Sequence, residues 1–108
     1  MPTRQTSAPV TVVITCTLKP GLVDHARREL ASVISTVMSD EPACRGIRVH
    51  ADPQAPHRLL IIEQWDSVEA FTGPHMQTDH MKAFLKTAES FLDAPADFTF
   101  WNEILTAP

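Results

Sequence analysis

The stretch "RLLIIEQWDSVEAF", residues 58–71, contains the pattern that decides the fold. Residues 59–62 are apolar at every position, whereas a strand with one face in water alternates apolar and polar residues. This run therefore predicts a strand that is buried on both faces. After Trp65 the pattern becomes that of a helix start, with Asp66 as the expected N-cap and Glu69 three residues later, as in a capping box.

The segments before this stretch predict a strand, a helix and a second strand. Residues 10–18, "VTVVITCTL", alternate apolar and polar side chains, and Pro20 and Gly21 end this first strand. Residues 22–41 repeat apolar side chains at helical spacing, and Pro42 ends the predicted helix. Residues 44–51 then predict a strand, which "DPQAP" turns back into the strand of residues 58–65 as a hairpin.

The segments after this stretch predict a second helix and a last strand. "GPHMQT", residues 73–78, is expected to interrupt the helical pattern, and a longer helix follows and ends before Pro95. Residues 97–105 predict the last strand. The order β-α-β-β-α-β predicts an α+β, ferredoxin-like fold, an antiparallel sheet with both helices on one face. We expect a single domain over residues 1–108, with its core at about 10–105 and residues 1–8 flexible.

Composition excludes several classes of protein. A chain of 108 residues is long enough for one core. The net charge is −4 and the Arg residues are scattered, so we expect no nucleic-acid partner. No apolar run approaches the roughly 18 to 20 residues of a membrane span, and no secretory signal precedes the first strand, so we expect a cytoplasmic protein without a membrane partner. Cys16 and Cys44 lie in different predicted strands, which indicates two buried thiols.

The second face of the predicted sheet carries too many apolar residues to face water. Residues 59–62 are apolar in both parities, and Val13 adds to the outer side of the first strand. The last strand is apolar on both faces, with Phe98 and Phe100 on one and Trp101 and Leu105 on the other. In a chain this short, the most economical cover is a second copy of the same face. The sequence therefore predicts a homodimer, a dimeric α+β barrel in which two sheets pack face to face. The alternative is a monomer with a few exposed apolar residues.

Two His residues near one end of the predicted sheet are candidates for a catalytic base. His75 lies in the expected break and His80 in the first turn of the following helix. A neutral imidazole, with an ordinary pKa of about 6.5, is well suited to taking a phenolic proton near neutral pH. The alternative is that one His caps a turn and the other is solvated. We expect no metal, because no third ligand has a suitable spacing.

Five further residues are expected to bind a substrate. Trp65 can stack on a flat aromatic molecule, or it can be the last core ring of its strand. Glu63 shares a strand face with Trp65, so it either faces a cavity or pairs with an Arg. Phe71, Met76 and Phe84 are expected to form an apolar wall, and the alternative for each is ordinary helix core.

The segments "VTVVITCTLKPG", "EPAC" and "DPQAPHRLLIIEQWDSVEAFTGPHMQTDHMKAF" together resemble the antibiotic biosynthesis monooxygenase (ABM) family of dimeric α+β barrels, over about residues 10–105. The resemblance implies a small dimeric oxygenase-like domain that acts on quinols or polycyclic phenols without metal or flavin. Two positions depart from the family. Ala43 stands where Gly is common, which indicates a turn without positive φ, and Ile61 stands where the polyketide-oxidising branch has Asn.

These observations lead to one mechanistic hypothesis and two alternatives. In the hypothesis, His75, or His80 as the alternate, removes a proton from a hydroquinone-like substrate held against Trp65. The anion then reduces dioxygen directly, and no cofactor is required. The alternatives are a non-catalytic dimer that binds a small ligand, and an isomerase or cyclase of a reactive oxo compound. The sequence leaves all three open.

Overall fold

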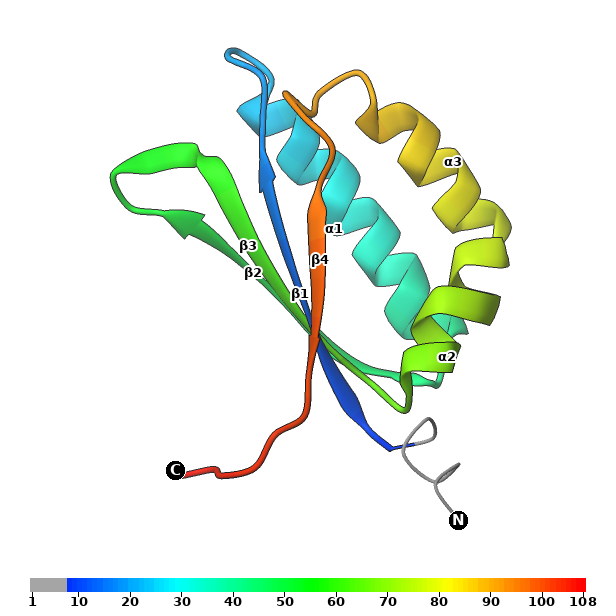
Figure 1. The fold of residues 1–108 in the computed structure, drawn as a ribbon. Coiled ribbons are helices and arrows are strands. Elements are labelled where there is room, and N and C mark those ends of the chain that lie inside the picture. Colours follow the sequence, from blue (N-terminus) through cyan, green and yellow to red (C-terminus); the bar gives the residue numbers. More distant parts are fainter. Residues whose placement is uncertain (1–7) are drawn as a thin grey trace.

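The computed structural model describes residues 8–108, so the predicted flexible segment 1–8 lies outside the described residues except for Ala8. Four antiparallel strands form one sheet in the order β2-β3-β1-β4 (Figure 1). These strands are β1 (Val10–Thr17), β2 (Cys44–Asp52), β3 (Ala55–Trp65) and β4 (Asp97–Trp101). The predicted β-α-β-β-α-β order and the α+β class are confirmed.

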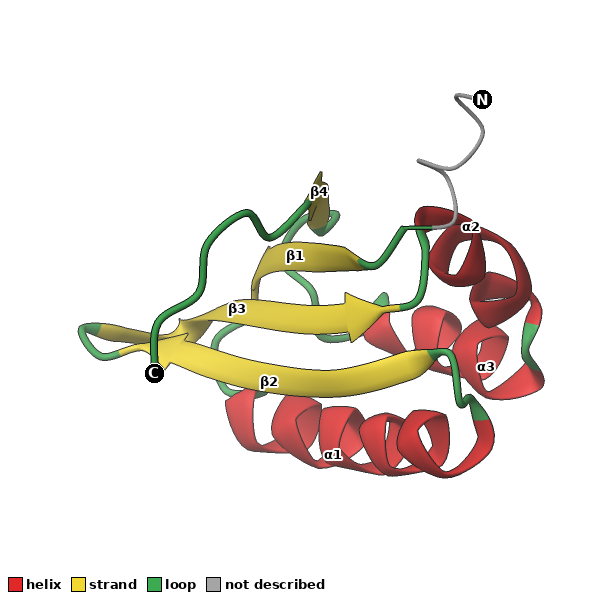
Figure 2. Cartoon of the chain, turned by 90° about the horizontal axis from the view of Figure 1, so that it is seen from below, coloured by secondary structure: helices red, strands yellow, loops and turns green. Residues whose placement is uncertain are grey.

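The helices lie together on one face of the sheet, as predicted, and the opposite face carries no helix in the described part of the chain (Figure 2). They are α1 (Val23–Asp40), α2 (Val68–Ala70), the wider π-helical segment η2 (Phe71–His75) and α3 (Asp79–Ala88). The apolar stripes of α1 and α3 pack onto the sheet and form the core. Its most buried members include Val12, Leu18, Val37, Trp65 and Phe91.

Strand β3 is the strand on which the site is built. It pairs with β1 on one side and β2 on the other, so its helix-facing residues lie in the middle of the sheet. Glu63 lies opposite Val12 of β1 and Ile47 of β2 in this register. A carboxylate therefore occupies a central position on the face that the helices cover.

The capping prediction at the end of β3 is wrong by one residue. Ser67, and not Asp66, is the N-cap of α2, because its hydroxyl oxygen accepts a hydrogen bond from the Ala70 amide at 3.0 Å. Asp66 instead accepts a hydrogen bond from Arg45 of β2 at 2.6 Å. The Asp66 amide also bonds to the Ala43 carbonyl at 2.9 Å, which keeps Asp66 in the turn that follows the strand.

The predicted interruption at residues 73–78 is also wrong in part. The chain stays helical through Gly73 and Pro74, because the segment winds more widely there instead of breaking at the proline, which has no amide hydrogen. The break falls at Thr78, whose side chain caps α3 by accepting a hydrogen bond from the Met81 amide at 3.2 Å.

The last strand is shorter than predicted. It pairs with β1 only from Thr11 to Thr15, so it ends at Trp101, and residues 102–105 extend beyond the sheet. Ile104 and Leu105 in that extension are both 87% exposed. The prediction that Ala43 does not adopt positive φ is confirmed, and Gly21, in the turn after β1, has a φ of +81°.

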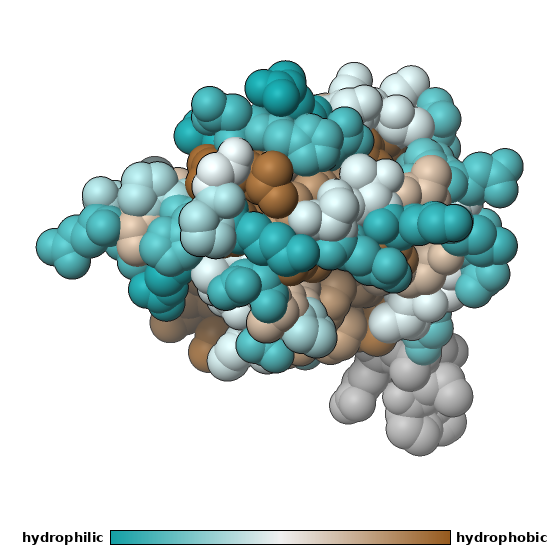
Figure 3. All heavy atoms as spheres, turned by 90° about the horizontal axis from the view of Figure 1, so that it is seen from above, coloured by the Kyte–Doolittle hydropathy of each residue, from teal (hydrophilic) through white to brown (hydrophobic). Residues whose placement is uncertain are grey.

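The remaining surface is mixed. No helix among residues 8–108 is both long and apolar enough to span a bilayer. On the side seen in Figure 3, hydrophobic areas are small and are separated by hydrophilic residues. The uncovered sheet face differs: Val13 and Ile62 pair directly across β1 and β3 there, and Leu60 remains 38% exposed.

Candidate active site

A cavity of about 100 Å³ lies between the sheet and the helices. Its lining is almost entirely apolar, and Glu63 and His75 are the only carboxylate and imidazole among the lining residues. The apolar lining includes Ile14, Val37, Ile61, Met81, Leu85 and Phe91. A cavity with one polar end is typical of a site that binds a mainly apolar molecule and orients it through a few polar atoms.

His75 is fixed at the end of η2. Its carbonyl accepts hydrogen bonds from the Thr78 hydroxyl at 2.9 Å and the Thr78 amide at 3.3 Å, so the same residue that caps α3 also holds the backbone of His75. The ring is 3% exposed and packs against Trp65 and Phe71, with centroid distances of 4.4 Å and 5.2 Å. Trp65 and Phe71 also contact each other, at 5.6 Å, so the three rings form one aromatic cluster that limits the movement of the imidazole.

Glu41 supplies the polar partner of this ring. His75 Nδ1 lies 2.9 Å from Glu41 Oε1 and 3.1 Å from Oε2. A carboxylate accepts hydrogen bonds and donates none, so Nδ1 carries the hydrogen and Nε2 of the neutral ring keeps its lone pair. A buried carboxylate that fixes the tautomer of a His base is an arrangement used in enzymes for proton transfer.

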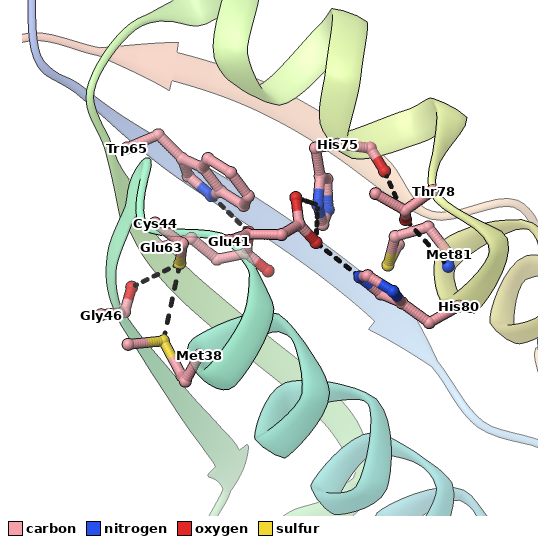
Figure 4. A network of polar contacts seen from close by, with 10 residues as sticks. All are labelled: Met38, Glu41, Cys44, Gly46, Glu63, Trp65, His75, Thr78, His80 and Met81. Atoms are coloured by element: carbon pink, nitrogen blue, oxygen red, sulfur yellow. Dashed lines mark hydrogen bonds and ion pairs between the residues drawn. The ribbon is translucent and has the colours of Figure 1, made fainter.

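His80 binds the same carboxylate from α3. Its Nε2 lies 2.6 Å from Glu41 Oε2, and Figure 4 shows the carboxylate between the two imidazole rings. His80 is not among the residues that line the cavity. Its side chain is 21% exposed, compared with 3% for His75 and 11% for Glu41. The three side chains therefore form a chain from the cavity toward the solvent.

The sequence reasoning missed Glu41, although a signal was present. Glu41 is the C-cap of α1, and its amide bonds to the Val37 carbonyl at 2.8 Å. A negative charge is unfavourable at the negative end of a helix dipole, and the last turn of α1 contains no basic residue to offset it. An acidic residue that breaks this rule suggests a partner elsewhere in the fold, which here is the pair of imidazoles.

Glu63 lies on the cavity wall beside Trp65. The indole Nε1 donates a hydrogen bond to Glu63 Oε1 at 2.8 Å. Of the two alternatives expected for Glu63, the structure shows the position on a cavity wall and, among residues 8–108, no ion pair with an Arg. Burial raises the pKa of the Glu63 carboxyl; the Trp65 hydrogen bond opposes this rise, and the negative charge of Glu41 adds to it. Glu63 can therefore carry a proton at a higher pH than an ordinary glutamate.

Burial lowers the pKa of His75 and favours its neutral form. The hydrogen bond and charge of Glu41 oppose this change, and the charge of His80 adds to it. The site thus combines a neutral imidazole with a carboxyl group that tends to keep its proton. Such a pair can accept a proton at one point of the cavity and donate one at another.

The two thiols take no part in this chemistry. Both are free, as predicted. Cys44 is buried, and burial raises its pKa to about 11; Cys16 lines the cavity and is half-buried, and burial raises its pKa as well. Because the thiolate is the nucleophilic form, both thiols are unreactive near neutral pH.

Glu41, His75 and His80 have the residue types of a two-His, one-carboxylate metal site. In this structure, however, the His nitrogens point at carboxylate oxygens at 2.6 to 3.1 Å and not at a common empty point. Within residues 8–108 no group of three or more His, Cys, Asp or Glu side chains is placed to hold a metal ion.

The other predicted site residues fall into two groups. Phe71, Met76 and Phe84 line the cavity, as their predicted position in an apolar wall requires. Trp65 is 1% exposed and is not among the lining residues, so it supports Glu63 and His75 from behind. Direct stacking of a substrate on Trp65 would require the cavity to open.

The family model for antibiotic biosynthesis monooxygenase (ABM) matches residues 9–87. The chain is also 32% identical over 87 residues to the Escherichia coli K12 protein named "Probable quinol monooxygenase YgiN", with 69% of this chain and 80% of that protein covered. The fold, the apolar cavity with its polar end and these matches define the class: the chain belongs to the antibiotic biosynthesis monooxygenase family.

Solved structures have the same fold. PA3566 from Pseudomonas aeruginosa is 26% identical with a TM-score of 0.79, and the match covers 93% of this chain and 98% of that one. A conserved protein from Methanosarcina mazei Go1 is 20% identical with a TM-score of 0.81, covering 94% and 99%. Rv0793 from Mycobacterium tuberculosis is 20% identical with a TM-score of 0.80, covering 94% and 100%. The two structures below 25% identity support the fold alone.

The raised pKa of Glu63 predicts a specific pH dependence of stability. The folded state keeps a proton that the unfolded state loses above about pH 4.3, so the free energy of unfolding falls as pH rises from there through the folded-state pKa. Glu63→Gln keeps an acceptor for Trp65 but cannot ionise. We expect its stability relative to the wild type to rise with pH through this window, by about 1.4 kcal/mol per unit of difference between the two pKa values.

Urea unfolding of both proteins at several pH values between about 4 and 8 measures this difference. Glu69→Gln, on the exposed side of α2, is the matched control and should show no such trend. Parallel pH curves for Glu63→Gln and the wild type would mean that Glu63 ionises as easily in the folded protein as in the unfolded chain.

Proposed function

We propose that this protein is a cofactor-independent monooxygenase that oxidises a quinol or another polyphenolic aromatic molecule with dioxygen. The observation that carries the proposal is His75, a buried imidazole oriented by Glu41, at the only polar end of an otherwise apolar cavity. Membership of the monooxygenase family and the name of the Escherichia coli relative support the same reaction class.

The proposed reaction begins with proton transfer from a substrate hydroxyl to Nε2 of His75. The Glu41 carboxylate favours this step, because its negative charge stabilises the imidazolium that forms, whereas burial of the ring opposes it. The electron-rich anion transfers electrons to dioxygen, and a carbon–oxygen bond forms to give a peroxide. Cleavage of the O–O bond leaves one oxygen atom in a hydroxyquinone and releases the other as water, so atoms and electrons balance without a further reductant.

Glu63 is proposed to act at the second oxygen of the substrate or at the peroxide. A neutral carboxyl can donate a hydrogen bond to a developing oxyanion, and burial raises the pKa of Glu63, which favours this protonated form. Trp65 keeps the carboxyl in place through the 2.8 Å hydrogen bond. In this proposal His75 is the base and Glu63 is the donor.

The cavity must widen to admit such a substrate. At about 100 Å³ it is smaller than the roughly 150 Å³ cavity that is known to admit benzene. Met76, Met81 and Phe84 are part of its wall, and Met side chains adapt readily to a new shape. We propose that substrate entry displaces these side chains while Glu63 and His75 stay fixed by their hydrogen bonds.

Oxygen uptake by the metal-free and flavin-free protein, over a panel of mono- and bicyclic quinols, tests the proposal. Replacing His75 by Gln is expected to lower the rate by about 10² or more, because it removes the base. The double variant His75→Ala, His80→Ala should lose at least as much. His57→Ala, at an exposed position of β3, is the control and should keep the wild-type rate.

Two results would contradict the proposal in different ways. Uptake that is unchanged in the His75 variants would remove His75 as the base. No uptake with any quinol, while a quinol or quinone still raises the melting temperature, would favour the ligand-binding alternative; conversion of an oxo compound without oxygen consumption would favour an isomerase or cyclase.

We further propose that the uncovered sheet face forms a homodimer, as in a dimeric α+β barrel. Val13, Leu60, Ile62 and Trp101 give this face a group of apolar side chains, and Trp101 is 58% exposed. The extension with Ile104 and Leu105 adds further exposed apolar surface. A face of this kind is better buried against an equal face than left in water.

Light scattering after gel filtration checks the dimer directly, and a mass of about twice 12.0 kDa is expected. Leu60→Asp should shift the protein toward the monomer, because a carboxylate would be buried without a partner in the interface. Val49→Asp on β2, which is similarly exposed but lies opposite the helix-facing Ile61, should leave the mass unchanged. A monomeric wild-type protein at micromolar concentration would refute this arrangement.

A further inference from the structure

The Glu41 cluster, defined as Glu41, His75 and His80, connects the cavity with the solvent. His75 lines the cavity, and the exposed fraction of the side chains increases from His75 through Glu41 to His80. Figure 4 shows both imidazole rings hydrogen-bonded to the one carboxylate. A base alone does not require the second imidazole, so His80 has no role in the reaction described above.

The hydrogen atoms of the cluster can be assigned from its geometry. Each imidazole donates one N–H to the carboxylate, from Nδ1 of His75 and from Nε2 of His80. The two remaining ring nitrogens are therefore the ends of the cluster. His75 Nε2 has no protein partner among the described residues. No side-chain nitrogen or oxygen in that part of the chain is both buried and unpaired, so this atom is accessible. Because His75 lines the cavity, we place the accessible atom on the cavity side.

The charges of the cluster favour one imidazolium and disfavour two. One positive ring beside the Glu41 carboxylate makes the group neutral, whereas two positive rings give it a net positive charge in a largely buried place. The two rings are joined through one carboxylate at 2.6 to 3.1 Å, so their protonation states are coupled. Uptake of a proton at one ring therefore promotes loss of a proton at the other.

We propose that Glu41 couples His75 and His80 in a proton exchange. In the resting cluster His80 is the imidazolium and His75 is neutral, and a proton taken from the substrate at His75 Nε2 is matched by release of the Nδ1 proton of His80 to solvent. This inference rests on the proposed function, in which the substrate hydroxyl supplies the proton. The balance is one proton in and one proton out, and the cluster stays neutral throughout. Glu41 and His80 are positioning residues, because neither contacts the cavity.

The groups that face the cluster from neighbouring elements are consistent with this exchange. Glu63 faces it from β3, and burial raises its pKa, which favours the uncharged carboxyl over the carboxylate. Cys44 faces it from β2 and stays a neutral thiol. Burial and the positive charge of His80 oppose protonation of His75, whereas the hydrogen bond and negative charge of Glu41 favour it.

Nitrogen-15 NMR titration of His75 tests the coupling without any substrate. In His80→Asn the opposing charge is gone, so His75 should titrate at a higher pH than in the wild type. In Glu41→Gln it should titrate at a lower pH. His57, at an exposed position of β3, should titrate at the same pH in all three proteins.

An unchanged titration of His75 in His80→Asn would overturn the proposal, whatever happens in Glu41→Gln. The Asn variant shortens a partly exposed side chain on α3 and leaves the hydrogen bond between Glu41 and His75 in place, so it tests the coupling separately from the orientation of the ring.

A kinetic measurement separates exchange from a merely structural role. His80→Ala should lower kcat about tenfold or more with little change in KM, and added imidazole should restore part of the rate by taking the place of the missing ring beside Glu41. Failure of imidazole to restore a lowered rate would contradict the exchange. If the wild type consumes no oxygen, the proposed function fails, whereas the coupling between His75 and His80 is still decided by the titration.

Discussion

The contact on which the candidate site depends is the hydrogen bond between the Glu41 carboxylate and His75 Nδ1, at 2.9 Å. It fixes the tautomer of a ring that packs against Trp65 and Phe71 at the polar end of an apolar cavity. Without the carboxylate, burial alone would leave a neutral imidazole of undefined tautomer. With it, the lone pair belongs to Nε2, the ring nitrogen that has no other protein partner among the described residues.

The fold supplies this contact from three elements that are distant in the sequence. Pro42 ends α1 so that Glu41 becomes its C-cap, Trp65 is the last residue of the central strand β3, and η2 brings His75 back against Trp65.

The elements of the fold were predictable to different degrees. The strand and helix order followed from the period of apolar residues, because burial imposes that period. The N-cap at Ser67 and the helical course through Pro74 did not, because each was decided by a local competition for hydrogen bonds.

The candidate site was predictable in its residue types more than in its connections. His75, Glu63 and the apolar wall of Phe71, Met76 and Phe84 could be assigned to one region from strand parity and helix spacing. Glu41 could not, because it lies 34 residues from His75 and its role depends on the packing of α1 against the end of the sheet. Its unfavourable position at a helix C-terminus was the one local sign of a partner.

The most direct measurement of the central claim is the tautomer of His75, read from the nitrogen-15 shifts of its two ring nitrogens near neutral pH. The account predicts a neutral ring with its hydrogen on Nδ1 and an unprotonated Nε2. It also predicts that Glu41→Gln disturbs this pattern. A hydrogen on Nε2 in the wild type would contradict the account, because the nitrogen that must accept the substrate proton would already be occupied.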